Sequence, residues 1–264
     1  METSTLDFID THCHLDSILS KLNLKDFSEL EARFLPDNFG GCITISCDPL
    51  SIQPTLALMD EEKIFGAFGI HPHDAQHYNP DLETQLVSAM DKSKTVAWGE
   101  IGLDYHYDFS LRKIQREVFT RQIQKGIGLG KPLIIHTREA EEDTLAIMRA
   151  EIPQDWKVHV HCFTSSENMA TALLSEFTQL CLGFTGILTF KNAVELQGIA
   201  STIPLDRFLL ETDGPFLAPI PHRGKAAHPG HIPLIAQKLA DLKGISLEEI
   251  YKAARLNTRK IYGI

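Results

Sequence analysis

The sequence predicts a single α/β domain, a (β/α)8 barrel that spans residues 1–264. Short β-rich apolar runs alternate with longer segments of helical spacing, which is typical of parallel βα units. The length also fits, since a barrel of this class needs about 250 residues. The predicted strands number eight: 6–10, 42–46, 63–70, 95–102, 132–136, 157–161, 179–184 and 207–212. A doubly wound open sheet is the alternative, because strand counts from sequence alone are error-prone.

Two helices between and after these strands are predicted from their own signals. Segment 111–130 places Ile114, Val118 and Ile123 along one apolar stripe, and glycine followed by Pro132 stops it. Segment 246–262 predicts a closing helix, with serine as its N-cap and a glutamate three residues later completing a capping box.

The composition predicts a soluble protein of a reducing compartment. Hydrophobic residues make up 43% and charged residues 23% of the chain, enough for a sizeable core. The sequence has no apolar run long enough to span a membrane, and the acidic N-terminus lacks the apolar region of a signal peptide. The five cysteines are scattered and odd in number, so we expect free thiols and a cytoplasmic location.

The net charge of -10 excludes binding to nucleic acid mainly through a basic overall field. If the protein handles DNA or RNA, we expect a local basic rim or metal ions to supply the attraction. Four cations that follow predicted strands are candidates for such a rim: Arg138, Lys191, Arg223 and Lys225.

Metal-competent side chains recur at the carboxyl ends of six predicted strands, where ligands sit in either fold. In chain order they are His12 and His14, His71 and His73, Glu100 and Asp104, His136, His161, and Glu211 and Asp213. A mixed histidine and carboxylate set without cysteine suits two divalent ions bridged by a carboxylate, such as Mg²⁺, Mn²⁺ or Zn²⁺. Such a pair activates water for hydrolysis, most naturally of a phosphoester.

Several of these residues keep alternative roles. Asp213 is a ligand, the general base for the attacking water, or both. Glu100 is a ligand or a buried ion-pair partner, and His159 competes with His161 because both share a strand face. Glu211 is expected to orient a histidine or loop amides. Tyr105 and Tyr107 are expected either to stack on a base or to pack the loop that follows the fourth strand.

Six motifs in order along the chain resemble the TatD-type metal-dependent hydrolases: "FIDTHCHLD", "GIHPHDA", "GEIGLDYHYD", "IIHTREA", "HCFTSSE" and "LETDGPFLAP". The resemblance implies a TIM barrel and metal-dependent DNA hydrolysis, frequently exonucleolytic. It implies one ion held by His12, His14, Glu100 and Asp213, and a second held by Glu100 as the bridge with His136 and His161. It also implies that His71 and Arg223 contact the substrate phosphate, on DNA that is single-stranded or presents an end.

The chain departs from the family pattern in the loop "RGKAAHP", where Ala227 and His228 stand in place of the usual Asn and Glu. His159 likewise stands where an aliphatic residue is usual, so we expect it to point into the barrel below the metals.

Two other functions remain open from the sequence. The first is hydrolysis of a C–N or lactone bond, as in related barrel amidohydrolases, many of which bridge their ions with a modified lysine on the fourth strand. Here that strand offers Glu100 and no lysine, which favours the phosphodiesterase. The second is a non-catalytic binding module, which is expected to have lost ligands, whereas the sequence retains all of them.

Overall fold

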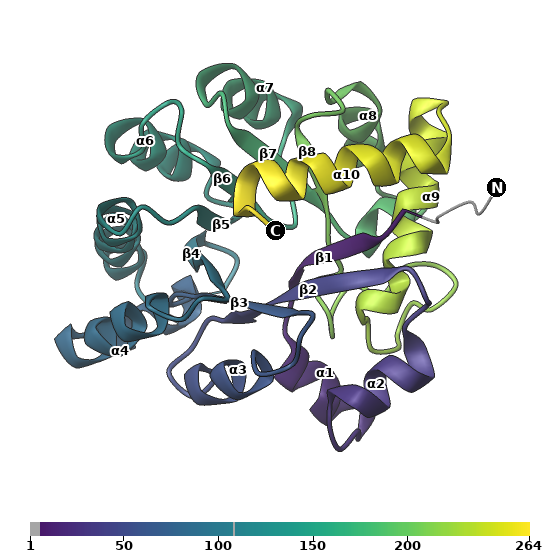
Figure 1. Ribbon diagram of the computed structural model, residues 1–264. Coiled ribbons are helices and arrows are strands. Elements are labelled where there is room, and N and C mark those ends of the chain that lie inside the picture. Colours follow the sequence, from purple (N-terminus) through teal and green to yellow (C-terminus); the bar gives the residue numbers. More distant parts are fainter. Residues whose placement is uncertain (1–5, 108) are drawn as a thin grey trace.

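The structure, a computed structural model, describes residues 6–107 and 109–264 and is a (β/α)8 barrel. Its eight parallel strands form one sheet in the order β1 to β8, with helices around the outside (Figure 1). The strands are β1 Phe8–Cys13, β2 Phe39–Ser46, β3 Ile64–Phe68, β4 Thr95–Asp104, β5 Leu133–Arg138, β6 Val158–Val160, β7 Leu180–Phe184 and β8 Phe208–Leu210. Every predicted strand therefore overlaps an observed one, and the barrel is confirmed over the open sheet.

The helices follow the strands in alternation. They are α1 Leu15–Leu22, α2 Phe27–Phe34, α3 Ile52–Leu58, α4 Pro80–Met90, α5 Arg112–Gly128, α6 Glu141–Glu151, α7 Glu167–Glu176, α8 Val194–Thr202, α9 Ile232–Lys243 and α10 Leu247–Tyr262. Three short 3₁₀ turns are η1 Pro72–His77, η2 Gly186–Thr189 and η3 Pro229–His231. No helix among the described residues combines the length and apolar character that crossing a membrane requires.

The barrel closes between β1 and the segment that follows β8. The Asp213 N–H donates to the His12 carbonyl oxygen at 2.9 Å. Beneath this bond the buried Asp10 carboxylate accepts from the Thr212 N–H at 2.9 Å and from the Thr212 hydroxyl at 2.5 Å. Burial raises the pKa of Asp10 to about 8, against the opposing effect of these hydrogen bonds. The closure therefore fixes His12 and Asp213 side by side.

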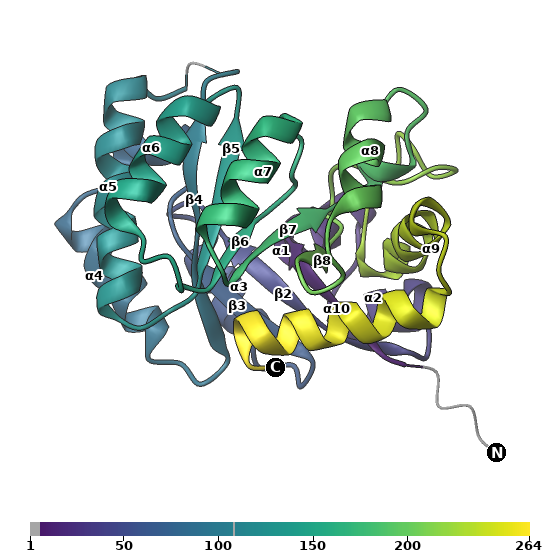
Figure 2. The same cartoon turned by 90° about the horizontal axis from the view of Figure 1, so that it is seen from above.

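The closing helix α10 lies across the mouth of the barrel at the amino ends of the strands (Figures 1 and 2). Its N-terminus has the predicted capping box, in which the Ser246 hydroxyl accepts from the Glu249 N–H and the glutamate side chain accepts from the serine N–H. At its other end Ile261 and Tyr262 pack with the barrel interior, among residues such as Ile43 and Leu209. The functional residues must therefore gather at the opposite mouth.

The buried face of helix α5 differs from the apolar stripe predicted for segment 111–130. Ile123 is buried, but Ile114 and Val118 are only half-buried, and the rest of the inner face includes Gln115 and Gln122. The Gln122 amide bonds the backbone N–H and C=O that follow β3, at 2.8 and 2.9 Å, and Gln115 does the same where β4 ends. The buried backbone groups at the strand ends need hydrogen-bond partners, and the two glutamine amides supply them. The buried face of α5 therefore contains glutamines at positions where the prediction expected apolar residues.

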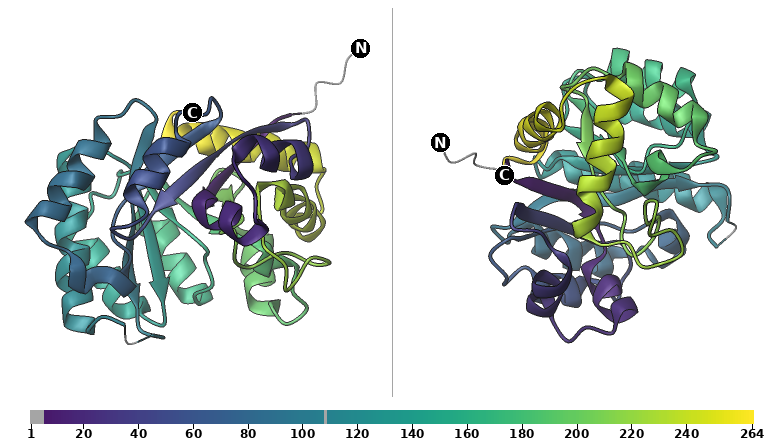
Figure 3. Two further views of the ribbon diagram at one scale, coloured as in Figure 1. Left: turned by 90° about the horizontal axis from the view of Figure 1, so that it is seen from below. Right: turned by 90° about the vertical axis from the view of Figure 1, so that its right-hand side faces the viewer.

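The segment between β8 and α9 lies against α1 and α2 (Figure 3). Ala227 in this segment is fully buried, and the ring of His228 packs against Phe34 with centroids 4.9 Å apart. His228 also donates its backbone N–H to Nδ1 of His231 at 3.3 Å. The two departures from the family loop thus serve the packing of this segment.

Candidate metal centre

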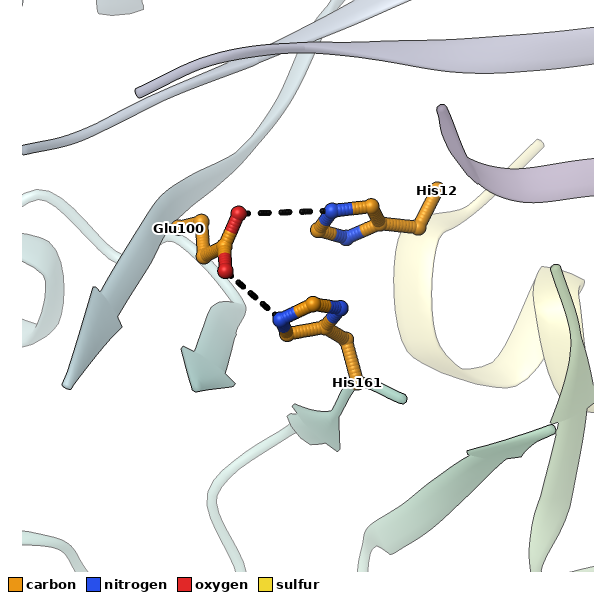
Figure 4. A group of neighbouring side chains, drawn as sticks. All are labelled: His12, Glu100 and His161. Carbon is orange, nitrogen blue, oxygen red and sulfur yellow. Dashed lines mark ion pairs between the residues drawn. The ribbon is translucent and has the colours of Figure 1, made fainter. Parts of the chain in front are cut away.

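The centre is built around the carboxylate of Glu100, which β4 carries into the mouth at the carboxyl ends of the strands. The side chain is almost fully buried, and Figure 4 shows one of its oxygens facing the imidazole of His12 and the other facing that of His161. Five ring nitrogens lie around its two oxygens: Nε2 of His12 at 3.4 Å, His14 at 4.0 Å, His71 at 3.4 Å and His161 at 2.6 Å, and Nδ1 of His136 at 2.9 Å.

The two oxygens of Glu100 face different histidines. Oε2 faces His12 and His14, while Oε1 faces the rings of three histidines, which are His71 after β3, His136 on β5 and His161 after β6. Asp213 Oδ1 belongs to the first side, 3.7 Å from His12 Nε2 and 3.5 Å from His14 Nε2. One carboxylate therefore divides the centre into two donor groups.

These groups fit divalent cations. Donor atoms that share one ion at about 2.1 Å each are roughly 3–3.5 Å apart, and the distances in this centre run from 2.6 Å for His161 to 4.0 Å for His14. Four groups have their donor atoms within 4.8 Å of one another, and three of them contain no cysteine: His12, Glu100 and His161; His12, His14 and Asp213; and His71, Glu100 and His136. Both ring nitrogens of the fully buried His12 make no hydrogen bond with any described residue. Buried polar atoms normally have partners, and an ion bound at Nε2, the nitrogen that faces Glu100 and Asp213, would supply one there.

The charges of the centre depend on one another. Burial would raise the pKa of Glu100, but the surrounding histidines, His161 and His71 first, hold it well below its usual value. Burial and the neighbouring His161 lower the pKa of His12 to about 4. Burial would also lower the pKa of His136, but hydrogen bonds to Asp104 and Glu100 raise it to about 9. The centre thus holds an ionised carboxylate next to both neutral and protonated imidazoles.

Asp213 follows β8 with a backbone φ of +52°. This left-handed conformation is uncommon outside glycine, although aspartate tolerates it better than most residues. It costs about 1 kcal/mol or more and persists only where the surroundings fix it. Here the barrel closure at His12 fixes it, which aims the carboxylate at His12 and His14.

Asp104 and His73 were expected at strand ends but were assigned to neither predicted ion, and both adjoin the centre. Asp104 Oδ2 lies 3.3 Å from Nε2 of His136 and 2.9 Å from Nε2 of His73. Since His136 faces Glu100 with its other nitrogen, Asp104 orients that ring from behind. A signal was present: Asp104 is four residues after Glu100 on one strand, which puts both side chains on the same face.

The structure separates His161 from its competitor His159. His161 faces Glu100, whereas the fully buried His159 has Nε2 at 3.1 Å from Glu211 Oε2 and Nδ1 at 2.7 Å from the Tyr262 hydroxyl. Glu211 also accepts the backbone N–H of Cys162, the residue after His161. Glu211 therefore anchors both histidines, as predicted, and His159 points into the barrel.

A cysteine also lies at the centre, although the sequence reasoning left this residue type out. Sγ of Cys47, just after β2, is 4.0 Å from Nδ1 of His14. It forms a further group with His14 and Glu100.

The predicted substrate contacts are only partly at the centre. His71 is there, with its Nδ1 accepting the His73 N–H. Arg138 is exposed at the end of β5 with its guanidinium over the ring of Tyr107 at 5.1 Å. Tyr105 is half-buried instead, with its hydroxyl 2.5 Å from Asp143, so it packs the loop. Arg223 lies over the ring of Phe190, with its guanidinium carbon 4.6 Å from the ring centroid.

Comparison with known proteins agrees with this geometry. The family model of the TatD related DNases matches residues 9–263. A human protein named 3'-5' RNA nuclease TATDN2 is 40% identical over 97% of this chain, which spans 35% of that protein. The Escherichia coli K12 protein named uncharacterized metal-dependent hydrolase YcfH is 36% identical over 97% of this chain and 96% of its own length.

Solved structures show the same fold. The crystal structure of YJJV, a TatD homolog from Escherichia coli K12, superposes with a TM-score of 0.86 at 25% identity and covers 97% of this chain and 98% of that one. An uncharacterized amidohydrolase from Saccharomyces cerevisiae superposes with a TM-score of 0.80 at 18% identity, covering 98% and 100%, which shows the fold alone. The family match over nearly the whole chain and the histidine and carboxylate centre lead to one conclusion: this chain belongs to the TatD family and is a metal-dependent hydrolase.

Proposed function

We propose that the protein is a deoxyribonuclease that hydrolyses phosphodiester bonds at single-stranded DNA or DNA ends, in an exonucleolytic manner, with two divalent ions. The observation that carries the proposal is the Glu100 carboxylate, whose two oxygens face different imidazoles. A carboxylate shared in this way is what a pair of divalent ions needs as its bridge.

The residues have distinct tasks in this proposal. His12, His14, Glu100 and Asp213 hold the first ion, and Glu100, His136 and His161 hold the second. Bound Mg²⁺, Mn²⁺ or Zn²⁺ would lower the pKa of a water and polarise the phosphoryl group.

Asp213 acts as the general base. It is 14% exposed, so one of its oxygens is open to a water whose proton it accepts. Glu100 stays ionised because the imidazoles hold its pKa low, and it keeps both donor groups at a fixed separation. His71 adjoins Glu100 at 3.4 Å with its side chain 13% exposed, which suits a hydrogen bond to the substrate phosphate.

The free cysteines support action in the cytoplasm, a reducing compartment. The choice of DNA over RNA rests on the family as a whole, and the name of the human relative makes RNA the alternative that the experiment must test. Net charge -10 implies that the ions supply most of the attraction for the phosphate backbone.

The test uses metal-free protein and end-labelled oligonucleotides of one sequence, as single-stranded DNA, duplex DNA and RNA. With Mg²⁺ or Mn²⁺ we expect stepwise shortening of single-stranded DNA from one end, and none with EDTA. Circular single strands should resist. Glu100→Gln and Asp213→Asn should abolish cleavage.

Asp74→Asn is the matched control, because Asp74 pairs with the exposed His77 at 3.2 Å outside the centre. It should cleave like the wild-type protein. If the protein cleaves RNA but not DNA, RNA replaces DNA as the proposed substrate. Hydrolysis of small amides or lactones without any cleavage of nucleic acid would overturn it.

A further inference from the structure

Two exposed aromatic rings stand on the loop that follows β4. The side chain of Tyr107 is 40% exposed and that of Phe109 is 59% exposed, among the most exposed large apolar groups of the described residues. The rings stack on one another with centroids 5.3 Å apart and planes at 12°. Arg138 extends the stack, because its guanidinium lies 5.1 Å from the centroid of Tyr107. We name this pair the Tyr107–Phe109 platform.

The platform is connected to the metal centre by direct contacts. The ring of His73 meets both aromatic rings edge-on, with centroids 5.4 Å from Tyr107 and 4.9 Å from Phe109. On its other side His73 lies 4.2 Å from the ring of His71, which in turn lies 3.4 Å from Glu100. Two imidazoles therefore separate the platform from the carboxylate at the middle of the centre.

The backbone of the first residues after β4, His106 and Tyr107, is anchored. Asp104 Oδ1 accepts the backbone N–H of Tyr107 at 3.2 Å and that of His106 at 2.9 Å. The same carboxylate contacts His136 through Oδ2. One side chain thus fixes both the aromatic loop and a ring of the metal centre.

Packing does not account for the exposure of these rings. A phenylalanine stabilises a fold when its side chain is buried away from water. More than half of the surface of Phe109 is exposed to water. Its aromatic faces beside a hydrolytic centre offer what an unpaired base needs, because every nucleobase has a face that stacks on aromatic rings. The guanidinium of Arg138 adds positive charge for the phosphate of the same nucleotide.

We infer that the Tyr107–Phe109 platform stacks the nucleobase of the nucleotide next to the scissile phosphate, so that the substrate is a strand with an unpaired base at that position. The inference rests on the proposed nuclease function and specifies its substrate. A paired base has both faces covered by its neighbours in the duplex, so it cannot use the platform without fraying.

The first test removes an aromatic ring of the protein and a base of the substrate, separately and together, and compares the effects on KM. Single-stranded oligonucleotides are prepared intact or with an abasic residue in the terminal dinucleotide that is cleaved first. Phe109→Ala should raise KM for the intact strand about tenfold, which is about 1.4 kcal/mol, with little change in kcat. For the abasic strand the same substitution should change KM less than twofold, because the stacking partner is already missing.

Two variants control this test. Phe109→Trp keeps an aromatic face and should keep the wild-type KM. Leu129→Ala removes another exposed apolar side chain, 41% exposed, from the turn between α5 and β5 and should leave KM unchanged for both strands. Equal effects of Phe109→Ala on intact and abasic strands would overturn the inference while leaving the nuclease function in place.

A binding measurement keeps the inference testable if no strand is cleaved. Asp213→Asn protein with Mg²⁺ is titrated into an oligonucleotide that carries 2-aminopurine in its terminal dinucleotide. Stacking should quench the fluorescence, and the additional substitution Phe109→Ala should remove the quenching. Absence of cleavage together with quenching would refute the nuclease but retain the base-binding platform. Absence of quenching would refute the platform whatever the activity.

Discussion

The Asp104 carboxylate behind His136 allows a quantitative prediction about metal affinity. Asp104→Asn keeps the size of the side chain but removes its charge, 3.3 Å from Nε2 of His136 and 2.9 Å from Nε2 of His73. Two full charges 3.3 Å apart interact by about 5 kcal/mol at an effective dielectric constant of about 20. An imidazole that binds a cation carries only part of a charge, so we expect a loss of about 1.4–2.8 kcal/mol, a 10- to 100-fold weaker affinity.

The size of this loss depends on pH, because the proton competes with the ion for His136. Hydrogen bonds to Asp104 and Glu100 outweigh burial and raise the pKa of this imidazole to about 9. Below that pH the ring is protonated and must lose its proton before it can bind an ion. Asp104→Asn lowers the pKa and reduces that cost, so the loss of affinity should be larger at pH 8.5 than at pH 7.0.

The assay is isothermal titration of metal-free protein with Mn²⁺ at both pH values, in two buffers of different ionisation enthalpy. The buffers report how many protons the ion displaces, and we expect fewer for Asp104→Asn at pH 7.0. Asp74→Asn is the control, since Asp74 holds the exposed His77 in a similar pair. Wild-type affinity in Asp104→Asn at pH 8.5, with circular dichroism and unfolding unchanged, would refute the role of Asp104.

Three further predictions concern metal content and stability. If the protein binds the two proposed ions, Glu100→Gln should lower bound metal to one ion or none per chain, measured by elemental analysis after dialysis, and retention of both ions would contradict the shared carboxylate. Gln122→Ala leaves a buried N–H and C=O without partners and should cost about 2–4 kcal/mol in urea unfolding, whereas the exposed Gln124→Ala should cost little. Burial lowers the pKa of His228 from 6.5 to about 4, so the unfolded chain takes up this proton first as pH falls. Stability is therefore lost between about pH 6.5 and pH 4, by roughly 3 kcal/mol at 1.36 kcal/mol per pH unit, and His228→Gln should flatten this part of the profile of unfolding free energy against pH.

The barrel and the residues of the centre were predictable because both are encoded in local patterns. Alternation of apolar runs and helical segments specifies a parallel βα fold, and the position of His12, Glu100 or His161 at a strand end specifies which mouth it faces. The spacing of His12 and His14 correctly predicted that both rings point to one side.

What the sequence did not reveal depends on contacts between distant segments. The buried glutamines of α5 look like surface residues until the strand ends that they bond are in place. Tyr105 and Tyr107 are two residues apart on one loop, and only the position of Asp143 on α6 decides which of them is held inside. Local periodicity carries no information about such pairings.

The chain of polar contacts from Glu211 through His159 to Tyr262 has a practical consequence. Tyr262 belongs to the last turn of α10 at one mouth of the barrel, and Glu211 holds the backbone beside His161 at the other. Protein engineers who alter the final helix, by fusing a partner or shortening its last turn, would therefore disturb the catalytic end from the far side of the molecule.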